Sequence, residues 1–174
     1  MIGAEAVKAS AFRLAGMNCG YTAGMVNFMH PNLEVHPPRS PRVTLGGFVA
    51  LPRIIDKCRA MHAGTAGDYN YNCPLDQRFF SFVKVDADAF AAEVKAGRND
   101  AELLAWVLAQ SPLDLHPVTI AAWSNAETAR APNNTTYRAK FNAMHEETAP
   151  HRQDVVTSFD LLDLDDFVSF GGKA

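Results

Sequence analysis

Long apolar runs are absent from this sequence, and no stretch approaches the roughly 20 residues that a helix needs to cross a bilayer. Cysteine is scarce, and three cysteines at wide, irregular spacing argue against a disulfide framework and for reduced thiols. A mildly apolar stretch over residues 15–29 follows two basic residues, but polar residues interrupt it, which disfavours a signal peptide. We therefore expect a cytoplasmic protein that does not associate with membranes.

Familiar catalytic and metal-binding motifs are also missing. The sequence contains no G-x-G-x-x-G fingerprint, no Walker loop, no G-x-S-x-G elbow and no H-E-x-x-H motif. Cys58 and His62 are spaced to share a metal ion with Cys73, but they lie on an apolar helix face and no fourth ligand is evident. The acidic cluster over residues 160–166 lacks the glycine and the ligand spacing of an EF-hand loop. We therefore expect neither a metal nor a cofactor.

The charge is unevenly distributed along the chain. The formal net charge of −3 is too small to indicate nucleic-acid binding. Residues 35–62 contain five basic residues and one acidic residue, whereas residues 146–174 contain seven acidic and two basic residues. Either these two regions face each other and neutralise their charges, or the basic region forms a pocket for a small anionic molecule.

Helical spacing of apolar residues dominates the pattern, and no strand-like alternation is long enough to predict a sheet. The sequence therefore predicts an all-α fold, a compact single domain of five to seven helices over residues 35–174. A very short two-stranded element is expected near Tyr69. Residues 1–34 read as an N-terminal extension, which is disordered, precedes the true start, or forms a short helix over residues 4–15.

Prolines at first helical positions, polar caps and terminal glycines set the expected helix boundaries. The first helix begins with Pro52 and ends at Gly64. Its buried face is expected to carry Leu51, Ile54, Ile55, Cys58, Met61 and His62. Further helices are expected from Pro74, from an Asp86 cap to Gly97, from an Asp100 cap, from Pro117, over 137–147, over 153–162, and from a start within 163–166.

The polar face of the first helix is a candidate anion site. Arg53, Asp56 and Arg59 are spaced three apart, so Asp56 is expected to bridge the two guanidinium groups. Lys57 adds a further positive charge one turn from Arg53. Such a face suits a carboxylate or a phosphate, because arginine offers a two-pronged donor. The alternative is a solvated helix face, or one paired with the acidic C-terminal region.

The run from Tyr69 to Asp76 is a second candidate site. With Pro74 as the first helical residue, Cys73 is the cap, and the helix dipole there favours its thiolate. Asp76 falls at the third helical position, where its carboxylate is expected to accept from the cap amide and to oppose the thiolate. Cys73 is therefore either a nucleophile or acid–base group, or part of a structural turn with a capping carboxylate.

Several of these segments resemble the bacterial family known as domain of unknown function 5069. The segments are Pro38–Pro41, Leu45–Gly47, Leu51–Arg59, Asn72–Asp76, Ala122–Ser124 and Asp160–Phe170. The resemblance implies a single bacterial domain over roughly residues 36–172 and implies no function. It also implies that the basic and Cys73-containing segments are motif positions, namely Arg39, Arg53, Asp56, Lys57, Arg59, Cys73 and Asp76.

Two functional hypotheses follow. The first is a cofactor-independent enzyme, of lyase, isomerase or hydrolase type, that acts on a small anionic metabolite. Its anion-binding residues would be Arg39, Arg53 and Arg59. Its candidates for proton transfer or attack would be Asp56, Lys57, Tyr69, Cys73 and Asp76. The second is a non-catalytic binding or assembly protein that uses the basic helix face as a docking surface. A deep pocket lined by Arg53, Tyr69 and Asp76 would favour the enzyme.

Overall fold

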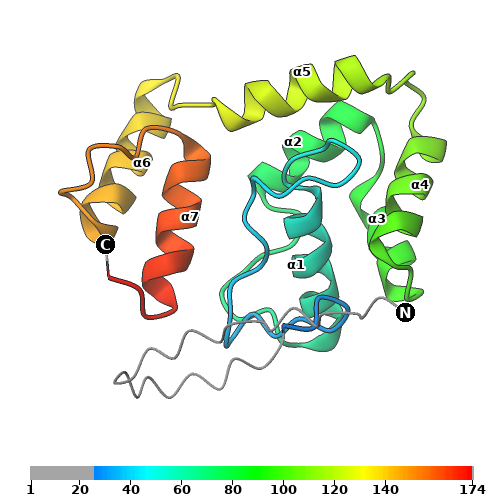
Figure 1. Ribbon diagram of the computed structural model, residues 1–174, viewed down its shortest axis with the longest axis horizontal. Coiled ribbons are helices and arrows are strands. Elements are labelled where there is room, and N and C mark those ends of the chain that lie inside the picture. The colour runs from blue at the N-terminus through cyan, green and yellow to red at the C-terminus, as the bar shows by residue number, and fades with distance from the viewer. Residues whose placement is uncertain (1–25, 174) are drawn as a thin grey trace, which may run out of the picture.

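The computed structural model describes residues 26–173 and folds them into seven α-helices without a β-strand (Figure 1). The helices are α1 (Leu51–Ala63), α2 (Pro74–Val83), α3 (Ala87–Lys95), α4 (Asp100–Gln110), α5 (Pro117–Thr128), α6 (Thr135–Thr148) and α7 (Ser158–Ser169). The all-α prediction is confirmed. The expected helix over residues 4–15, Cys19 and most of the stretch 15–29 lie outside the described residues. Among the helices of residues 26–173, none has both the length and the apolar composition needed to span a membrane.

Proline and glycine mark several helix ends as expected. Pro52, Pro74 and Pro117 each lie at the first or second position of a helix, where a missing amide proton costs nothing. Gly64 ends α1 in the left-handed conformation, at a φ of 72°, and its amide donates to the carbonyls of Ala60 and Met61. The boundaries of α1 and α2 are therefore determined by local chemistry.

The start of α4 differs from the prediction by one residue. Asn99, not Asp100, caps this helix, because its side chain accepts from the Glu102 amide while Glu102 accepts from the Asn99 amide. Asp100 is the first helical residue, and its carboxylate pairs with Arg39 and Arg59 instead.

The C-terminal region forms one helix rather than the two predicted. Thr157 caps α7 by accepting from the Asp160 amide, and Asp160 accepts in return from the Thr157 amide. Residues 153–157 form turns and a bend, so the expected helix over 153–162 is wrong. Val155 and Val156 have the spacing of a helical apolar stripe, but they precede the capping box, and the helix begins at Ser158.

The two-stranded element expected near Tyr69 is also wrong. That segment forms turns, with the Tyr69 amide donating to the Ala66 carbonyl, while the Asn70 carbonyl accepts from the Lys57 ammonium. The isolated β-bridge of the described residues joins Leu45 and Phe48 instead. Side-chain and local bonds therefore satisfy the backbone groups near Tyr69 without strand pairing.

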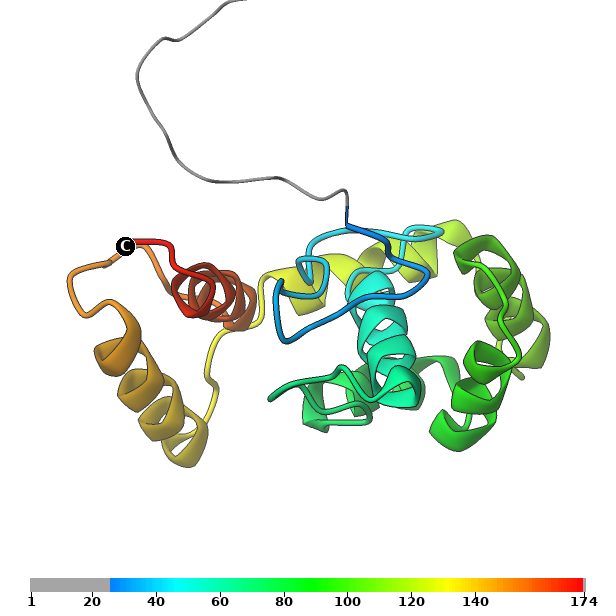
Figure 2. The same cartoon turned by 90° about the horizontal axis from the view of Figure 1, so that it is seen from below.

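The helices enclose two separate apolar cores. The larger core surrounds α1, whose Leu51, Ile54, Ile55 and Cys58 are fully buried. A smaller core lies where α6 packs against α7 and includes Phe141 and Val155. Figures 1 and 2 show α5 running from α4 toward the α6–α7 pair, which stands beside the α1–α4 group.

The last turn of α1 extends past the larger core. Met61 is 40% exposed and His62 is exposed, so both are misplaced in the predicted buried face. Before the helices, residues 26–34 pack on the domain. Within this segment Leu33 is buried and its amide donates to the Thr65 carbonyl at 2.8 Å.

Candidate functional site

The polar face of α1 is buried rather than solvated. The exposed fractions of Arg53, Asp56, Lys57 and Arg59 are 3%, 0%, 3% and 7%. Buried charges are tolerated only when they are paired and hydrogen-bonded. Each of these four side chains meets that condition, with partners from other segments of the chain.

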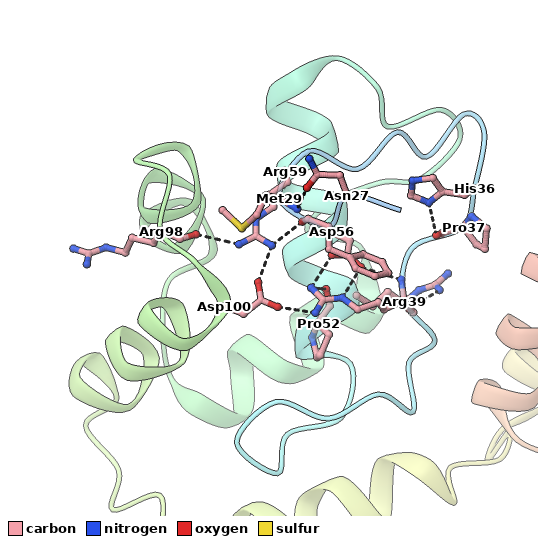
Figure 3. Close-up of polar contacts among 12 residues, drawn as sticks. Asn27, Met29, His36, Pro37, Arg39, Pro52, Asp56, Arg59, Arg98 and Asp100 are labelled. Carbon is pink, nitrogen blue, oxygen red and sulfur yellow. Dashed lines mark hydrogen bonds and ion pairs between the residues drawn. The ribbon is translucent and has the colours of Figure 1, made fainter. Parts of the chain in front are cut away.

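Asp56 pairs with Arg39 rather than bridging Arg53 and Arg59 (Figure 3). The Nε and Nη2 atoms of Arg39 lie 2.9 and 2.7 Å from the two carboxylate oxygens of Asp56, and the Arg39 amide adds a third bond. Asp100 then joins the two arginines, accepting from Arg39 at 2.6 Å and from Arg59 at 2.7 Å. The expected bridge is therefore wrong, because Arg39 satisfies both oxygens of Asp56 from outside the helix.

The acidic C-terminal region faces part of the basic region, since two of the five basic residues, Arg42 and Arg53, pair with acidic residues of α7. Arg53 makes a two-armed pair with Asp166 of α7, at 2.6 and 3.1 Å. Arg42 contacts both Asp160 and Asp163. The Tyr69 hydroxyl donates to Asp166 at 2.8 Å, next to Arg53. These contacts attach α7 to α1 and leave the pair of Arg53 and Asp166 electrically neutral.

A cleft of about 1170 Å³ lies between the α1–α2 part of the larger core and the α6–α7 pair. One wall comes from α1, the segment over residues 67–73 and the start of α2. The other wall comes from Arg130, Tyr137 and α7. The polar residues that line it on the first wall include Arg53, Lys57, Tyr69 and Cys73. Its volume is slightly above the range of about 300–1,000 Å³ that is typical of small-molecule sites.

Lys57, Cys73 and Asp76 form a compact cluster at this first wall. The Lys57 ammonium lies 2.7 and 2.8 Å from the two Asp76 oxygens, 3.3 Å from Cys73 Sγ and 3.1 Å from the Asn70 carbonyl oxygen. An ammonium has three protons, so these three groups use all of them. Asp76 is therefore occupied by Lys57, and the expectation that it bonds the cap amide of α2 is wrong. Cys73 does cap α2, through its backbone and without a side-chain bond.

Two further groups at the cleft have shifted pKa values. Burial, together with the hydrogen bond to Asp166, raises the pKa of the Tyr69 phenol, which therefore acts as a donor rather than a base. Burial and the neighbouring negative charge of Asp166 also raise the pKa of the Asp165 carboxyl, although Arg53 opposes this. Asp165 lines the cleft, and within residues 26–173 it has no ion-pair partner. In the sequence, Asp165 is recognisable only as one member of a general acidic cluster.

One buried carboxylate holds a pair of arginines from the two walls, Arg78 of α2 on the first wall and Arg130 on the second. Arg78 Nε and Arg130 Nε lie 2.7 and 3.1 Å from the same oxygen of Glu127, and Arg78 Nη2 contacts the other oxygen. Arg130 also donates to the Tyr137 hydroxyl at 3.0 Å, and Tyr137 contacts Ser158. The sequence did not indicate this cluster, because Arg78 and Glu127 are 49 residues apart and follow no local spacing.

A comparison with known protein families matches the part of the chain that contains the cleft. Residues 35–168 match the family model described as "Domain of unknown function (DUF5069)". The chain belongs to the DUF5069 family. No curated protein matches the sequence. The match includes the residues that line the cleft except for Leu33, Glu34, Ser169 and Phe170.

Within this DUF5069 domain, the predicted site residues separate into two groups. Arg53, Lys57, Tyr69 and Cys73 line the cleft, and Asp76 lies directly behind Lys57. Arg39, Asp56 and Arg59 belong to the buried network around Asp100, outside the cleft lining. The structure thus brings together the Cys73 run and only one of the three predicted anion-binding arginines.

The three residues considered as metal ligands, Cys58, His62 and Cys73, do not lie together around one point. Cys58 is fully buried in the larger core, and burial raises the pKa of its thiol to about 12. His62 lies on the exposed end of α1, with its ring 3.0 Å from the Ala91 carbonyl. Across residues 26–173, no three acidic, histidine or cysteine side chains are arranged to hold a metal ion.

Proposed function

We propose that this DUF5069 protein is an enzyme that binds a small anionic metabolite in the cleft and transforms it with its own side chains. The observation that carries the proposal is the 3.3 Å contact between Lys57 Nζ and Cys73 Sγ at the cleft wall. A cysteine beside an ammonium in a partly exposed cavity is the environment in which thiols serve as nucleophiles. Cys58 offers the contrast, because it is fully buried and is not among the residues that line the cleft.

Each residue of the cluster has a distinct role in this proposal. Cys73 Sγ attacks an electrophilic carbon of the metabolite. Lys57 is held by its three acceptors, and once Cys73 Sγ has bonded to carbon, the proton that Lys57 had directed at Sγ goes to the atom that gains the negative charge. Asp76 is a positioning residue that fixes the Lys57 ammonium through both of its oxygens.

A hydrolysis illustrates the balance of such a reaction. The thiolate forms a bond to a carbonyl carbon, the bond to the leaving group breaks, and the leaving group takes the proton of Lys57. Water then attacks the resulting thioester, returns one proton to Lys57 and releases the thiolate and an acid. Tyr69, which keeps its proton, donates its one hydrogen bond to Asp166 at the same wall. A lyase or an isomerase would use the same groups for proton transfer.

The docking hypothesis has less support. It requires an exposed basic helix face, but that face of α1 is buried and paired with Arg39, Asp76, Asp100 and Asp166. The cleft, in contrast, satisfies the criterion stated from the sequence in two of its three residues, since Arg53 and Tyr69 line it while Asp76 lies behind Lys57. A concave site is therefore the better basis for a function.

The test measures the reactivity of Cys73 toward iodoacetamide, with the alkylated cysteine identified by peptide mass mapping. We expect Cys73 to react faster in the folded protein than in the urea-unfolded chain, and Cys58 to stay unmodified until unfolding. The double substitution Lys57→Met with Asp76→Leu removes the cluster without leaving an unpaired buried charge. It should slow alkylation of Cys73 severalfold. A Cys73 that reacts no faster than in the unfolded chain, or that is indifferent to the double substitution, would overturn the proposal.

A further inference from the structure

We infer that Arg78 and Arg130, held together by Glu127, form the site in the cleft that binds the anionic group of the metabolite. The group is an oxyanion, a carboxylate or a phosphate. This inference rests on the proposed function, in which the cleft holds a small anionic molecule. It replaces the arginines chosen from the sequence, two of which lie outside the cleft lining.

Glu127 gives this site its rigidity. Its side chain is only 6% exposed and accepts from Arg78 of α2 and from Arg130, which follows α5. Burial opposes ionisation of Glu127, but the hydrogen bonds and positive charges of Arg78 and Arg130 together outweigh burial and lower the pKa of its carboxyl. The carboxylate therefore stays charged and fixes two guanidinium groups that come from separate parts of the fold. Such pre-positioned donors bind an anion without first losing side-chain freedom.

The ratio of cations to carboxylates distinguishes this cluster from the other ion pairs of the cleft. Arg53 is neutralised by Asp166 and Lys57 by Asp76, each in a one-to-one pair. Arg78 and Arg130 share a single carboxylate, so this cluster alone keeps a net charge of +1 among the paired cations of the cleft. The lining also carries the acidic residues Glu34, Asp68 and Asp165, so the attraction for one anionic group comes from this cluster and not from the cleft as a whole.

Donor groups remain available for that anion. Glu127 and Tyr137 occupy Nε and Nη2 of Arg78, and Nε and Nη1 of Arg130. Within the described residues, no acceptor contacts Arg78 Nη1 or Arg130 Nη2. Both residues line the cleft, and the Arg78 side chain is 46% exposed. Arginine donors of this kind make the strong, charge-assisted bonds that carboxylates and phosphates accept.

The position of the cluster also fits the chemistry at Cys73. Arg78 lies on α2, the helix that Cys73 caps, and both residues line the same cleft. A molecule whose oxyanion is held by Arg78 and Arg130 therefore keeps the rest of its atoms in the cavity where Cys73 is exposed. The implied substrate class is a small acid or phosphate ester with an electrophilic carbon.

The experiment uses inorganic phosphate and malonate as probes of the full-length protein, at constant ionic strength. Each probe should raise the Tm by about 2–4 °C at about five times its Kd. Arg78→Gln and Arg130→Gln should each raise the Kd of the preferred probe about tenfold, because each removes charge-assisted bonds. Arg98→Gln is the matched control, since Arg98 is 44% exposed and paired with Glu93 but does not line the cleft. A preference for malonate identifies a carboxylate ligand, and a preference for phosphate identifies a phosphate ester.

A second measurement needs no substitution and covers the case in which the variants do not fold. Phenylglyoxal modification, mapped by mass spectrometry, should be slowed by the probe at Arg78 and Arg130 but not at Arg98. Absence of probe binding, binding unchanged in both variants, or equal protection of all three arginines would overturn the inference. Failure of the proposed function is distinguishable, because it leaves probe binding at Arg78 and Arg130 intact while Cys73 remains unreactive toward iodoacetamide.

Discussion

Arg39 and Asp56 form a two-armed ion pair in the interior, with Arg39 Nη2 2.7 Å from Asp56 Oδ1 and Nε 2.9 Å from Oδ2. The segment before α1 is thereby attached to the middle of that helix. Asp100 extends the pair to Arg59, so α4 is fastened to the same network (Figure 3). These residues form the structural support behind α1, whereas Arg53 and Lys57 face the cleft.

The first prediction concerns this ion pair. Asp56→Ala should destabilise the protein by about 3–5 kcal/mol, because it leaves the Arg39 guanidinium partly buried without its main partner. Urea unfolding followed by circular dichroism measures the change. The matched control is Arg98→Ala, which removes an exposed pair with Glu93 and should cost less than about 1 kcal/mol.

A double substitution separates the pair from its surroundings. Arg39→Met with Asp56→Leu replaces the charges by apolar side chains of similar length and should recover much of the stability lost in Asp56→Ala. Because Arg39 also binds Asp100, the recovery should be incomplete. A single Asp56→Ala variant as stable as the wild-type protein would contradict the structural role assigned to this pair.

How far the sequence predicts the structure depends on whether the cause is local. The starts of α1 and α2 and the end of α1 were predictable because Pro52, Pro74 and Gly64 act through their own backbone. The partner of Asp56 was not predictable, because Arg39 lies outside the helix. Arg53 and Arg59 are at favourable helical spacing from Asp56, yet Arg39 pairs with it instead. For the candidate site, Cys73 was identified from its cap position, but Glu127 was missed because its partners are distant in sequence.

The second prediction concerns the start of α7, where the sequence-based boundary was wrong. Thr157→Ala removes the side-chain acceptor of the Asp160 amide and should cost about 1 kcal/mol of unfolding free energy. Thr157→Ser keeps the hydroxyl and should remain close to the wild type. Chemical denaturation of both variants makes the comparison, and equal stability of the two would argue that the capping box does not define this boundary.

The third prediction concerns the stability of the protein at low pH. Burial opposes ionisation of Asp100 and Glu127, yet hydrogen bonds from Arg39 and Arg78 lower the pKa of each carboxyl below its ordinary value. A carboxyl with a lowered pKa in the folded state stabilises the protein above its unfolded pKa and loses that contribution as the pH falls through the folded pKa. The Tm should therefore decline as the pH falls below about 4.5.

Glu127→Gln tests the contribution of one carboxyl to that decline. The variant should be less stable than the wild type at pH 7, and the difference should shrink as Glu127 becomes protonated at low pH. Thermal melts of both proteins over the acidic range measure it. A difference that is constant with pH would contradict the assigned pairing with Arg78 and Arg130.

The last prediction concerns Asp165, whose pKa is shifted in the opposite direction from those of Asp100 and Glu127. Burial and the charge of Asp166 raise the pKa of its carboxyl, so its ionised form is disfavoured in the fold. A group with a raised pKa contributes stability below its unfolded pKa, near 4, and loses it as the pH rises through the folded value. Asp165→Asn should therefore stabilise the protein at pH 7, by less than about 1 kcal/mol because the group is only half-buried.

The control for Asp165 is Asp163→Asn, on the same helix. Asp163 accepts from Arg42 at 3.1 Å, so its loss should leave stability unchanged or slightly lower at pH 7. Urea unfolding of both variants at pH 7 and at pH 3 measures the effect, and the gain of Asp165→Asn should vanish at the lower pH. A carboxylate that costs stability while lining a cavity indicates selection for chemistry rather than for folding. If Asp165→Asn did not stabilise the protein at pH 7, that reason to include Asp165 in the site would be removed.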